Sequence, residues 1–162
     1  MMLRIAKIAS IASLWLVCSC GQEKCEEPAP TLEFVRYKYQ PKPANVSTVS
    51  DTLTIVTRFT DCQGDVGSED PEDKNLRTYL YEKINGQWQR YYPPDSVDSV
   101  AFFANIPYSK KVKQGVKVEG LLEQRFGAVR QNSDTIRFET YIIDREGNKS
   151  NRVLTPDTII PN

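Results

Sequence analysis

The sequence of 162 residues contains no histidine. That absence excludes histidine-based catalytic triads and the usual zinc sites. No glycine-rich loop follows a strand-like segment and opens a helix, so the common nucleotide-binding motifs are missing too. The chain also has no excess of charge of either sign, because 21 basic residues balance 21 acidic ones. The balance gives no electrostatic case for nucleic-acid binding. We therefore expect a protein that is not an enzyme, and the enzymatic alternative that composition leaves open is a paired-carboxylate hydrolase.

Segments with a convincing helical period are absent after residue 20. Short runs that alternate apolar and polar residues take their place, separated by turn residues. The clearest runs are Thr52–Phe59 and Thr135–Ile143. The pattern predicts an all-β, antiparallel sandwich or barrel of about seven strands over residues 31–162. The other expected strands are Thr31–Tyr39, Leu76–Ile84, Gln87–Tyr92, Val97–Ile106, Val116–Phe126 and Arg152–Ile160.

Local signals refine four of these strands. Asn85-Gly86 predicts a type I′ hairpin, Gly120 predicts a β-bulge, and Pro156 indicates an edge strand. Alternation within the first strand predicts two faces, one with Leu32 and Phe34 and the other with Glu33, Val35, Tyr37 and Tyr39.

Residues 1–19 are typical of a secretory signal peptide, with Arg4 and Lys7 preceding the apolar run Ile8–Val17. Val17-Cys18-Ser19-Cys20-Gly21 resembles a bacterial lipobox. The resemblance implies cleavage before Cys20, a lipid on its sulfur, and a tether over residues 20–30. The alternatives are lipidation of Cys18, a membrane-anchor helix, and an unlipidated secreted protein.

Two cysteines, Cys25 and Cys62, remain after the signal peptide and the lipidated residue. In an oxidising compartment they predict one disulfide. The alternatives are two free thiols or a bridge between molecules.

Near the C-terminus, Asp144, Gly147, Asn148 and Ser150 carry a resemblance to the last hairpin of immunoglobulin-like and fibronectin-type domains of bacterial surface proteins. A wider resemblance is to small lipoproteins of Bacteroidota that have an immunoglobulin-like sandwich and an Asp-Gly-Asp-Gly-Asp loop. This chain departs from that loop, because Cys62 replaces a glycine and Gln63 an aspartate. The resemblance implies an immunoglobulin/fibronectin-like fold and a lipid-anchored address, and it implies no activity. The matching residues are Phe59, Asp61, Gly64, Asp65 and Gly67, then Tyr81–Lys83, Asn85–Gly86 and Asp134–Glu139.

The acidic loop, residues 61–73, carries six carboxylates between two expected strands. Oxygen ligands on a tightly turning backbone suit calcium, so we consider a calcium site formed by Asp61, Gln63 and Asp65. An immunoglobulin-like topology would bring Asp144 to the same end, and Cys25 close to Cys62. The alternative is a solvated loop whose aspartates organise their own backbone, and the neutral Gln63 favours this alternative.

Three other features have a functional and a structural interpretation. The lysine run Lys110–Lys117 suits an anionic lipid or a solvated edge. Five triplets of aspartate, serine or threonine, and an aliphatic residue resemble the O-glycosylation acceptors of Bacteroidota, and the alternative is that each simply begins a strand. They lie at 51–53, 95–97, 98–100, 134–136 and 157–159. A set of aromatic residues suits a sugar- or partner-binding surface, or core and cross-strand pairs. The set consists of Trp88, Tyr91, Tyr92, Phe102 and Phe103.

These features together predict an outer-membrane-anchored lipoprotein that acts as a non-enzymatic binding or accessory module of the cell envelope. Its partner would be a protein or a glycan, and the end with the acidic loop is the expected contact surface. The alternative is a structural or assembly subunit of a larger envelope complex. Whether the domain faces the periplasm or the cell surface stays open.

Overall fold

The computed structural model describes residues 27–41, 51–92, 102–108, 115–127 and 135–159. Within these ranges the protein is all-β, and no helix there is long and apolar enough to span a membrane. The predicted signal peptide 1–19 and most of the tether 20–30, including Cys20, lie outside the described residues. The strands are β1 (Thr31–Gln40), β2 (Thr52–Asp61), β3 (Leu76–Ile84), β4 (Gln87–Arg90), β5 (Phe102–Ala104), β6 (Val118–Gly127), β7 (Thr135–Ile142), β8 (Val153–Leu154) and β9 (Thr158–Ile159).

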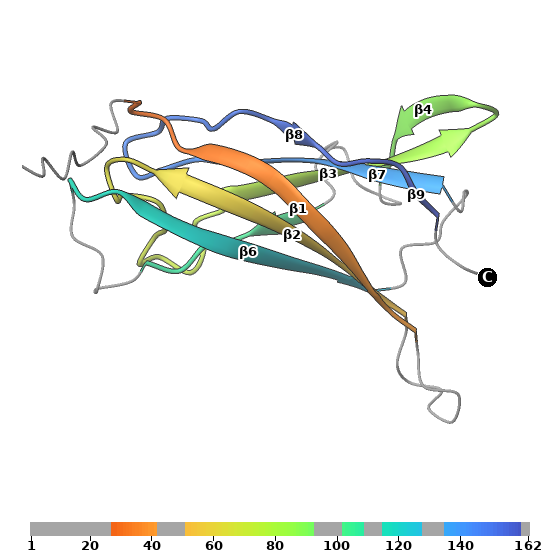
Figure 1. Ribbon diagram of the computed structural model, residues 1–162, viewed down its shortest axis with the longest axis horizontal. Coiled ribbons are helices and arrows are strands. Elements are labelled where there is room, and N and C mark those ends of the chain that lie inside the picture. Colours follow the sequence, from red (N-terminus) through yellow and green to blue (C-terminus); the bar gives the residue numbers. More distant parts are fainter. Residues whose placement is uncertain (1–26, 42–50, 93–101, 109–114, 128–134, 160–162) are drawn as a thin grey trace, which may run out of the picture.

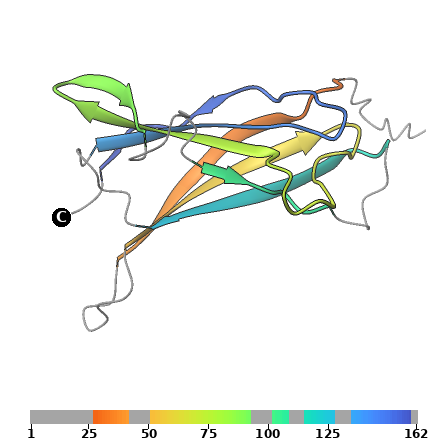
Figure 2. The ribbon, with the colours of Figure 1, turned by 180° about the vertical axis from the view of Figure 1, so that it is seen from behind.

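The strands form two antiparallel sheets that pack face to face (Figures 1 and 2). The first sheet has the order β1-β2-β6. The second sheet has the order β4-β3-β7-β8, with β5 paired to β3 and β9 paired to β7. The protein is therefore an antiparallel β-sandwich, as predicted. The β3–β4 hairpin projects at one end, and the loop after β2 lies at the other end with the turn between β7 and β8 (Figure 1).

The sandwich is held together by apolar side chains from the inner faces of both sheets. Phe138 on β7 is fully buried and stacks on Phe126 of β6, with ring centroids 4.8 Å apart. Each fully buried side chain of this size stabilises the fold by about 1.5–3 kcal/mol relative to exposure. Two clusters make up the core, one of Leu53, Ile55, Leu80, Phe126, Ile136 and Phe138, the other of Leu32, Leu76, Ile106, Ile142 and Val153.

A β-bulge in β1 changes the predicted faces of this strand. The register with β2 shifts between Phe34 and Arg36, and the alternation therefore changes phase there. Phe34 and Tyr37 consequently both pack against the core, with their ring centroids 5.0 Å apart. The prediction that Tyr37 lies on the face opposite to Phe34 was wrong, because simple alternation assumes an uninterrupted strand.

The hairpin prediction is confirmed, and the bulge prediction at Gly120 is wrong. Asn85 and Gly86 both have positive φ, 51° and 80°, as a type I′ turn requires. Gly120 instead lies in an unbroken register with Phe59 of β2. A Cβ atom there would approach the Phe59 ring to 2.5 Å, so glycine makes room for the aromatic ring.

The predicted strand Arg152–Ile160 is divided into β8 and β9, and the residues around the break join the two sheets. Thr155 accepts a hydrogen bond from the Phe138 amide (2.8 Å), and the Tyr37 hydroxyl donates to the Thr155 hydroxyl (2.6 Å). Burial raises the pKa of Tyr37 to about 12, so the phenol keeps its proton. β1 is thereby fastened to the second sheet.

Asn151 closes the edge of β1 in place of a strand. Its side-chain oxygen accepts a hydrogen bond from the Leu32 amide (2.7 Å), and its side-chain nitrogen donates to the Leu32 carbonyl (2.9 Å). One amide side chain thus satisfies both backbone groups of a buried residue, which would otherwise lack partners.

Asn151→Ala should lower the free energy of unfolding by about 1–3 kcal/mol, because it leaves the two backbone groups of Leu32 unsatisfied. Urea unfolding followed by circular dichroism measures the effect. The control Gln87→Ala removes an exposed amide from β4 and should change stability by less than about 0.5 kcal/mol. Equal effects of the two changes would show that Asn151 has no special role.

Candidate functional site

Asp61 ends β2 and folds the acidic loop around its own carboxylate. The side chain is fully buried. Its Oδ1 accepts a hydrogen bond from the Gln63 amide (3.0 Å), and its Oδ2 accepts from the amides of Asp65 (2.7 Å) and Val66 (2.8 Å). Charge-assisted hydrogen bonds of this kind are among the stronger ones in proteins. The structural interpretation of this aspartate, a side chain that organises its own backbone, is therefore correct.

The second half of the loop is held against the chain that follows β5. The amide of Ser68 donates to the Ile106 carbonyl (2.9 Å), and the amide of Tyr108 donates to the Ser68 carbonyl (3.0 Å). Gly67 has φ of 99°, and a Cβ there would lie 3.0 Å from the Pro107 carbonyl oxygen. The loop can approach this segment only because Gly67 is a glycine.

The turn between β7 and β8 joins the acidic loop, as the predicted topology required. Arg145 donates from Nε to the Asp65 carbonyl (3.0 Å) and from Nη2 to the Gly64 carbonyl (3.3 Å). Its guanidinium lies 4.5 Å from the centre of the Tyr108 ring. Three segments that are far apart in sequence therefore meet at one end of the sandwich.

Asp65 is the unusual residue of this end. It is 1 % exposed, and neither carboxylate oxygen has a hydrogen-bond partner. Burial, with the nearby charges of Asp144, Asp61 and Glu146, raises the pKa of Asp65 from 3.8 to about 6. The ionised form is thus disfavoured by its surroundings.

The predicted calcium ligands do not assemble into a site. The described residues hold no group of three or more cysteine, aspartate or glutamate side chains arranged to bind a metal. Asp61 uses both oxygens on the loop backbone, and Asp144 accepts from the Asn148 amide (2.8 Å) and side chain (3.0 Å). Calcium requires six to eight oxygens, and Asp65 is the one predicted carboxylate whose oxygens are not engaged. Gln63, the fourth predicted ligand, is half-buried.

Cys62 lies inside the loop, next to Asp61. It is half-buried and disulfide-bonded. Cys25 lies outside the described residues, so the pairing of these two cysteines stays a prediction. The first described residues do precede β1 at the same end as the loop, where Thr31 pairs with Thr60.

The outer face of the second sheet holds a set of residues that the sequence analysis did not bring together. We call it the arginine-aromatic face. Alternation and register place its members on one side of β3, β4, β5 and β7 or beside these strands. The cations lie over aromatic rings, with Arg90 4.2 Å from the Tyr79 ring centre and Arg137 4.2 Å from that of Trp88. The face comprises Lys74, Arg77, Lys83, Arg90, Arg137, Arg152, Tyr79, Tyr81, Trp88, Phe103, Tyr141 and Glu139.

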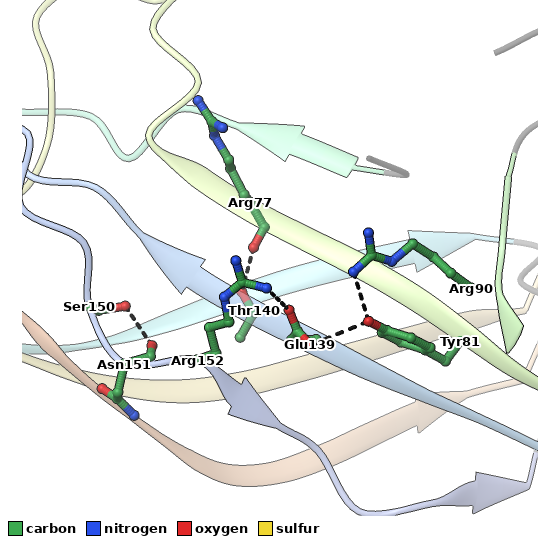
Figure 3. Close-up of polar contacts among 8 residues, drawn as sticks. All are labelled: Arg77, Tyr81, Arg90, Glu139, Thr140, Ser150, Asn151 and Arg152. Atoms are coloured by element: carbon green, nitrogen blue, oxygen red, sulfur yellow. Dashed lines mark hydrogen bonds and ion pairs between the residues drawn. The ribbon is translucent and has the colours of Figure 1, made fainter. Parts of the chain in front are cut away.

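A chain of polar contacts crosses the middle of this face (Figure 3). Arg90 donates to the Tyr81 hydroxyl (2.9 Å), which donates in turn to Glu139 (3.3 Å). Arg152 donates to the other oxygen of Glu139 (2.7 Å). Glu139 is the one carboxylate at the outward positions of β3, β4 and β7, so positive charge exceeds negative charge on this face.

The sequence carries a signal for this face that the prediction of aromatic residues used only in part. Arginine and aromatic residues, with one glutamate, occupy every second position in Arg77-x-Tyr79-x-Tyr81, in Trp88-x-Arg90 and in Arg137-x-Glu139-x-Tyr141. The five predicted aromatic residues separate in the structure. Trp88 and Phe103 belong to the face, whereas Phe102 and Tyr91 pack against the core. Tyr92 is exposed.

The lysine run and the glycosylation-like triplets receive little support as sites. Most of the lysine run and two of the triplets lie outside the described residues. Thr52, Thr135 and Thr158, the hydroxyl residues of three other triplets, each begin a strand, as the structural interpretation predicts.

A cavity of about 370 Å³ is lined by residues of β5, of the segment that follows it and of β6. Its lining is mainly apolar and includes one carboxylate, Glu123, which forms an ion pair with Lys38. A paired-carboxylate hydrolase needs two carboxylates across a cleft. The described lining of the cavity does not provide this pair.

Comparison with known proteins found no match to this chain among protein families, curated proteins or solved structures.

Asp65→Asn should stabilise the protein at pH 7.5 by about 1–3 kcal/mol, because it removes a charge that the folded state disfavours. The pKa of Asp65 is raised in the folded state, so the wild type gains stability as the pH falls from about 6 to 3.8. The advantage of the variant should therefore vanish below pH 4. Thermal unfolding from pH 3.5 to 8 measures both effects, and a constant difference across this range would contradict the assignment.

Millimolar calcium should leave the thermal midpoint of the wild type unchanged at pH 7.5, because the loop presents too few free oxygens for this ion. Magnesium at equal concentration controls for ionic strength. If calcium raises the midpoint of the wild type but not that of Asp65→Asn, the predicted calcium site forms and the expectation is wrong.

Proposed function

We propose that this protein is an outer-membrane-anchored lipoprotein that acts as a non-enzymatic binding or accessory module of the cell envelope. The observation that carries the binding role is the arginine-aromatic face, where cations and aromatic rings are gathered without a matching number of carboxylates. Arginine, tyrosine and tryptophan are the residues that contribute most to protein interfaces. The resemblance to small Bacteroidota lipoproteins supports the location.

The anchor in this proposal is a lipid on Cys20, followed by the tether 20–30. We also propose that Cys25 is the disulfide partner of Cys62, which would fasten the tether to the acidic loop. The support is the lipobox-like Val17–Gly21, the position of Cys62 in the loop, and the start of β1 at the same end of the sandwich. The domain would then stand on the membrane with its acidic end nearest the anchor.

A non-enzymatic role is supported by the chemistry of the described residues. The cavity between β5 and β6 is lined by a single carboxylate, and that carboxylate is paired with a lysine. Asp65, whose pKa is raised, is buried inside the loop and does not line this cavity. General acid–base catalysis requires such a group within reach of a substrate.

The alternative is a structural or assembly subunit of an envelope complex. The strand β6 favours it, because this ten-residue strand pairs with β2 alone among the described residues and forms a sheet edge. An edge of this kind can accept a strand from another protein. Stoichiometric co-purification with one partner through detergent extraction would favour this alternative over a transient binding module.

Cys20→Ser should release the protein from the membrane, because a serine hydroxyl is not a substrate for lipidation at the lipobox. Expression in a bacterial host, fractionation of the envelope and labelling with a fatty-acid analogue measure anchoring. The matched control Cys18→Ser should remain labelled and membrane-bound. If Cys20→Ser stays anchored and Cys18→Ser does not, the lipid is on Cys18; if both are soluble or both are anchored, the lipobox assignment is wrong.

A further inference from the structure

We propose that the arginine-aromatic face is the docking surface for an acidic protein partner, which places Asp and Glu side chains against the stacked guanidinium groups. This inference rests on the proposed binding role and gives it a surface and a ligand chemistry. It does not depend on the lipid anchor. The surface lies on the outside of the second sheet and is separate from the acidic loop.

The cations of this face are held in place before any partner binds. Arg90 lies over Tyr79, Arg137 over Trp88 and Arg152 over Tyr141, at 4.2, 4.2 and 5.2 Å from the ring centres. Rings that are themselves packed on a sheet restrict the guanidinium groups to few positions, which lowers the entropy lost when a ligand binds. The planar edge of a guanidinium can still donate two parallel hydrogen bonds to a carboxylate.

Two arginines of the face lack an anionic partner within the part of the chain that is described. Arg77 and Arg137 form no ion pair there. The Nε atoms of both arginines are buried without a hydrogen-bond acceptor. Both oxygens of Glu139 already accept hydrogen bonds, one from Arg152 and one from Tyr81. This single carboxylate therefore does not neutralise the other cations of the face.

The outer face of the opposite sheet provides the contrast. There three exposed cations form ion pairs, Lys38–Glu123 and Arg58–Glu33 between strands and Lys117–Glu119 within one segment. Arg36 and Arg125 of the same face form no ion pair within the described residues. Both faces belong to one chain with equal numbers of basic and acidic residues. The unneutralised charge on the second sheet is therefore a local property, and it is complementary to an acidic partner.

The form of the face favours a protein over a glycan. Sugar rings bind by stacking on exposed aromatic rings, whereas here guanidinium groups cover the rings, and Tyr79 and Tyr141 are buried. The residues spread over four neighbouring strands, the breadth of a protein interface, and consist of the tyrosine, tryptophan and arginine residues that are enriched in such interfaces.

The test measures binding of the full-length protein in detergent micelles to poly-L-glutamate by fluorescence anisotropy. We expect binding at low salt that weakens steeply as salt is added, because the contacts are between exposed charges. Arg77→Gln combined with Arg137→Gln should weaken binding by about tenfold or more. The control pair Arg36→Gln and Arg58→Gln removes the same charge from the opposite sheet and should leave the affinity within about twofold of wild type.

Circular dichroism and the thermal midpoint establish that both double variants are folded. Three results would overturn the proposal. The first is no binding of the wild type to poly-L-glutamate, or an equal loss of affinity in the two double variants. The second is tighter binding to polygalacturonate with the same dependence on Arg77 and Arg137, which would identify a glycan surface. The third is oligomers of the wild type that Arg77→Gln and Arg137→Gln abolish, which would identify a second copy of the chain as the occupant.

Discussion

The structure depends on the packing of two sheets through a narrow apolar layer, in which Phe138, Ile55 and Leu80 are almost completely excluded from water. Because side chains alternate along a strand, a residue that enters this layer forces its neighbours to the outside. On β3 and β7 those neighbours are arginines and tyrosines. The same alternation that builds the core therefore builds the charged, aromatic outer face.

The acidic loop and the arginine-aromatic face hold their charged side chains in different ways. At the acidic loop, one carboxylate organises the backbone and another is buried without partners, so local folding has used most of the oxygen ligands. On the second sheet, the rings hold the cations and few acids neutralise them. The chain is neutral as a whole, but one face of the second sheet has an excess of positive charge. In the loop that was predicted to bind a cation, backbone amides donate hydrogen bonds to the carboxylate oxygens.

Alternation, turn residues and proline positions were sufficient to predict the sandwich, the long strands and the I′ hairpin, because these signals are local. The bulge near Phe34 and the close contact between Gly120 and Phe59 could not be predicted, because each depends on what the neighbouring strand places opposite. At the site, topology correctly predicted that the Asp144 turn would meet the loop. The three amides that occupy Asp61 could not be predicted from the spacing of acids, since that spacing serves a turn as well as a metal. The arginine-aromatic face needed the register of β3 with β4 and β7, which the sequence does not state.

The position of β1 determines how the domain bears mechanical load. This strand begins at the end where the chain enters the sandwich, and it pairs with β2 from Thr31 to Gln40 in the antiparallel sense. A force that pulls the residues before Thr31 along the direction of β1 acts across the hydrogen bonds between β1 and β2 and not parallel to them. All the bonds between β1 and β2 then share the force in shear, and they do not open one after another. The grip of Asn151 on Leu32 adds resistance at the point where such a force enters.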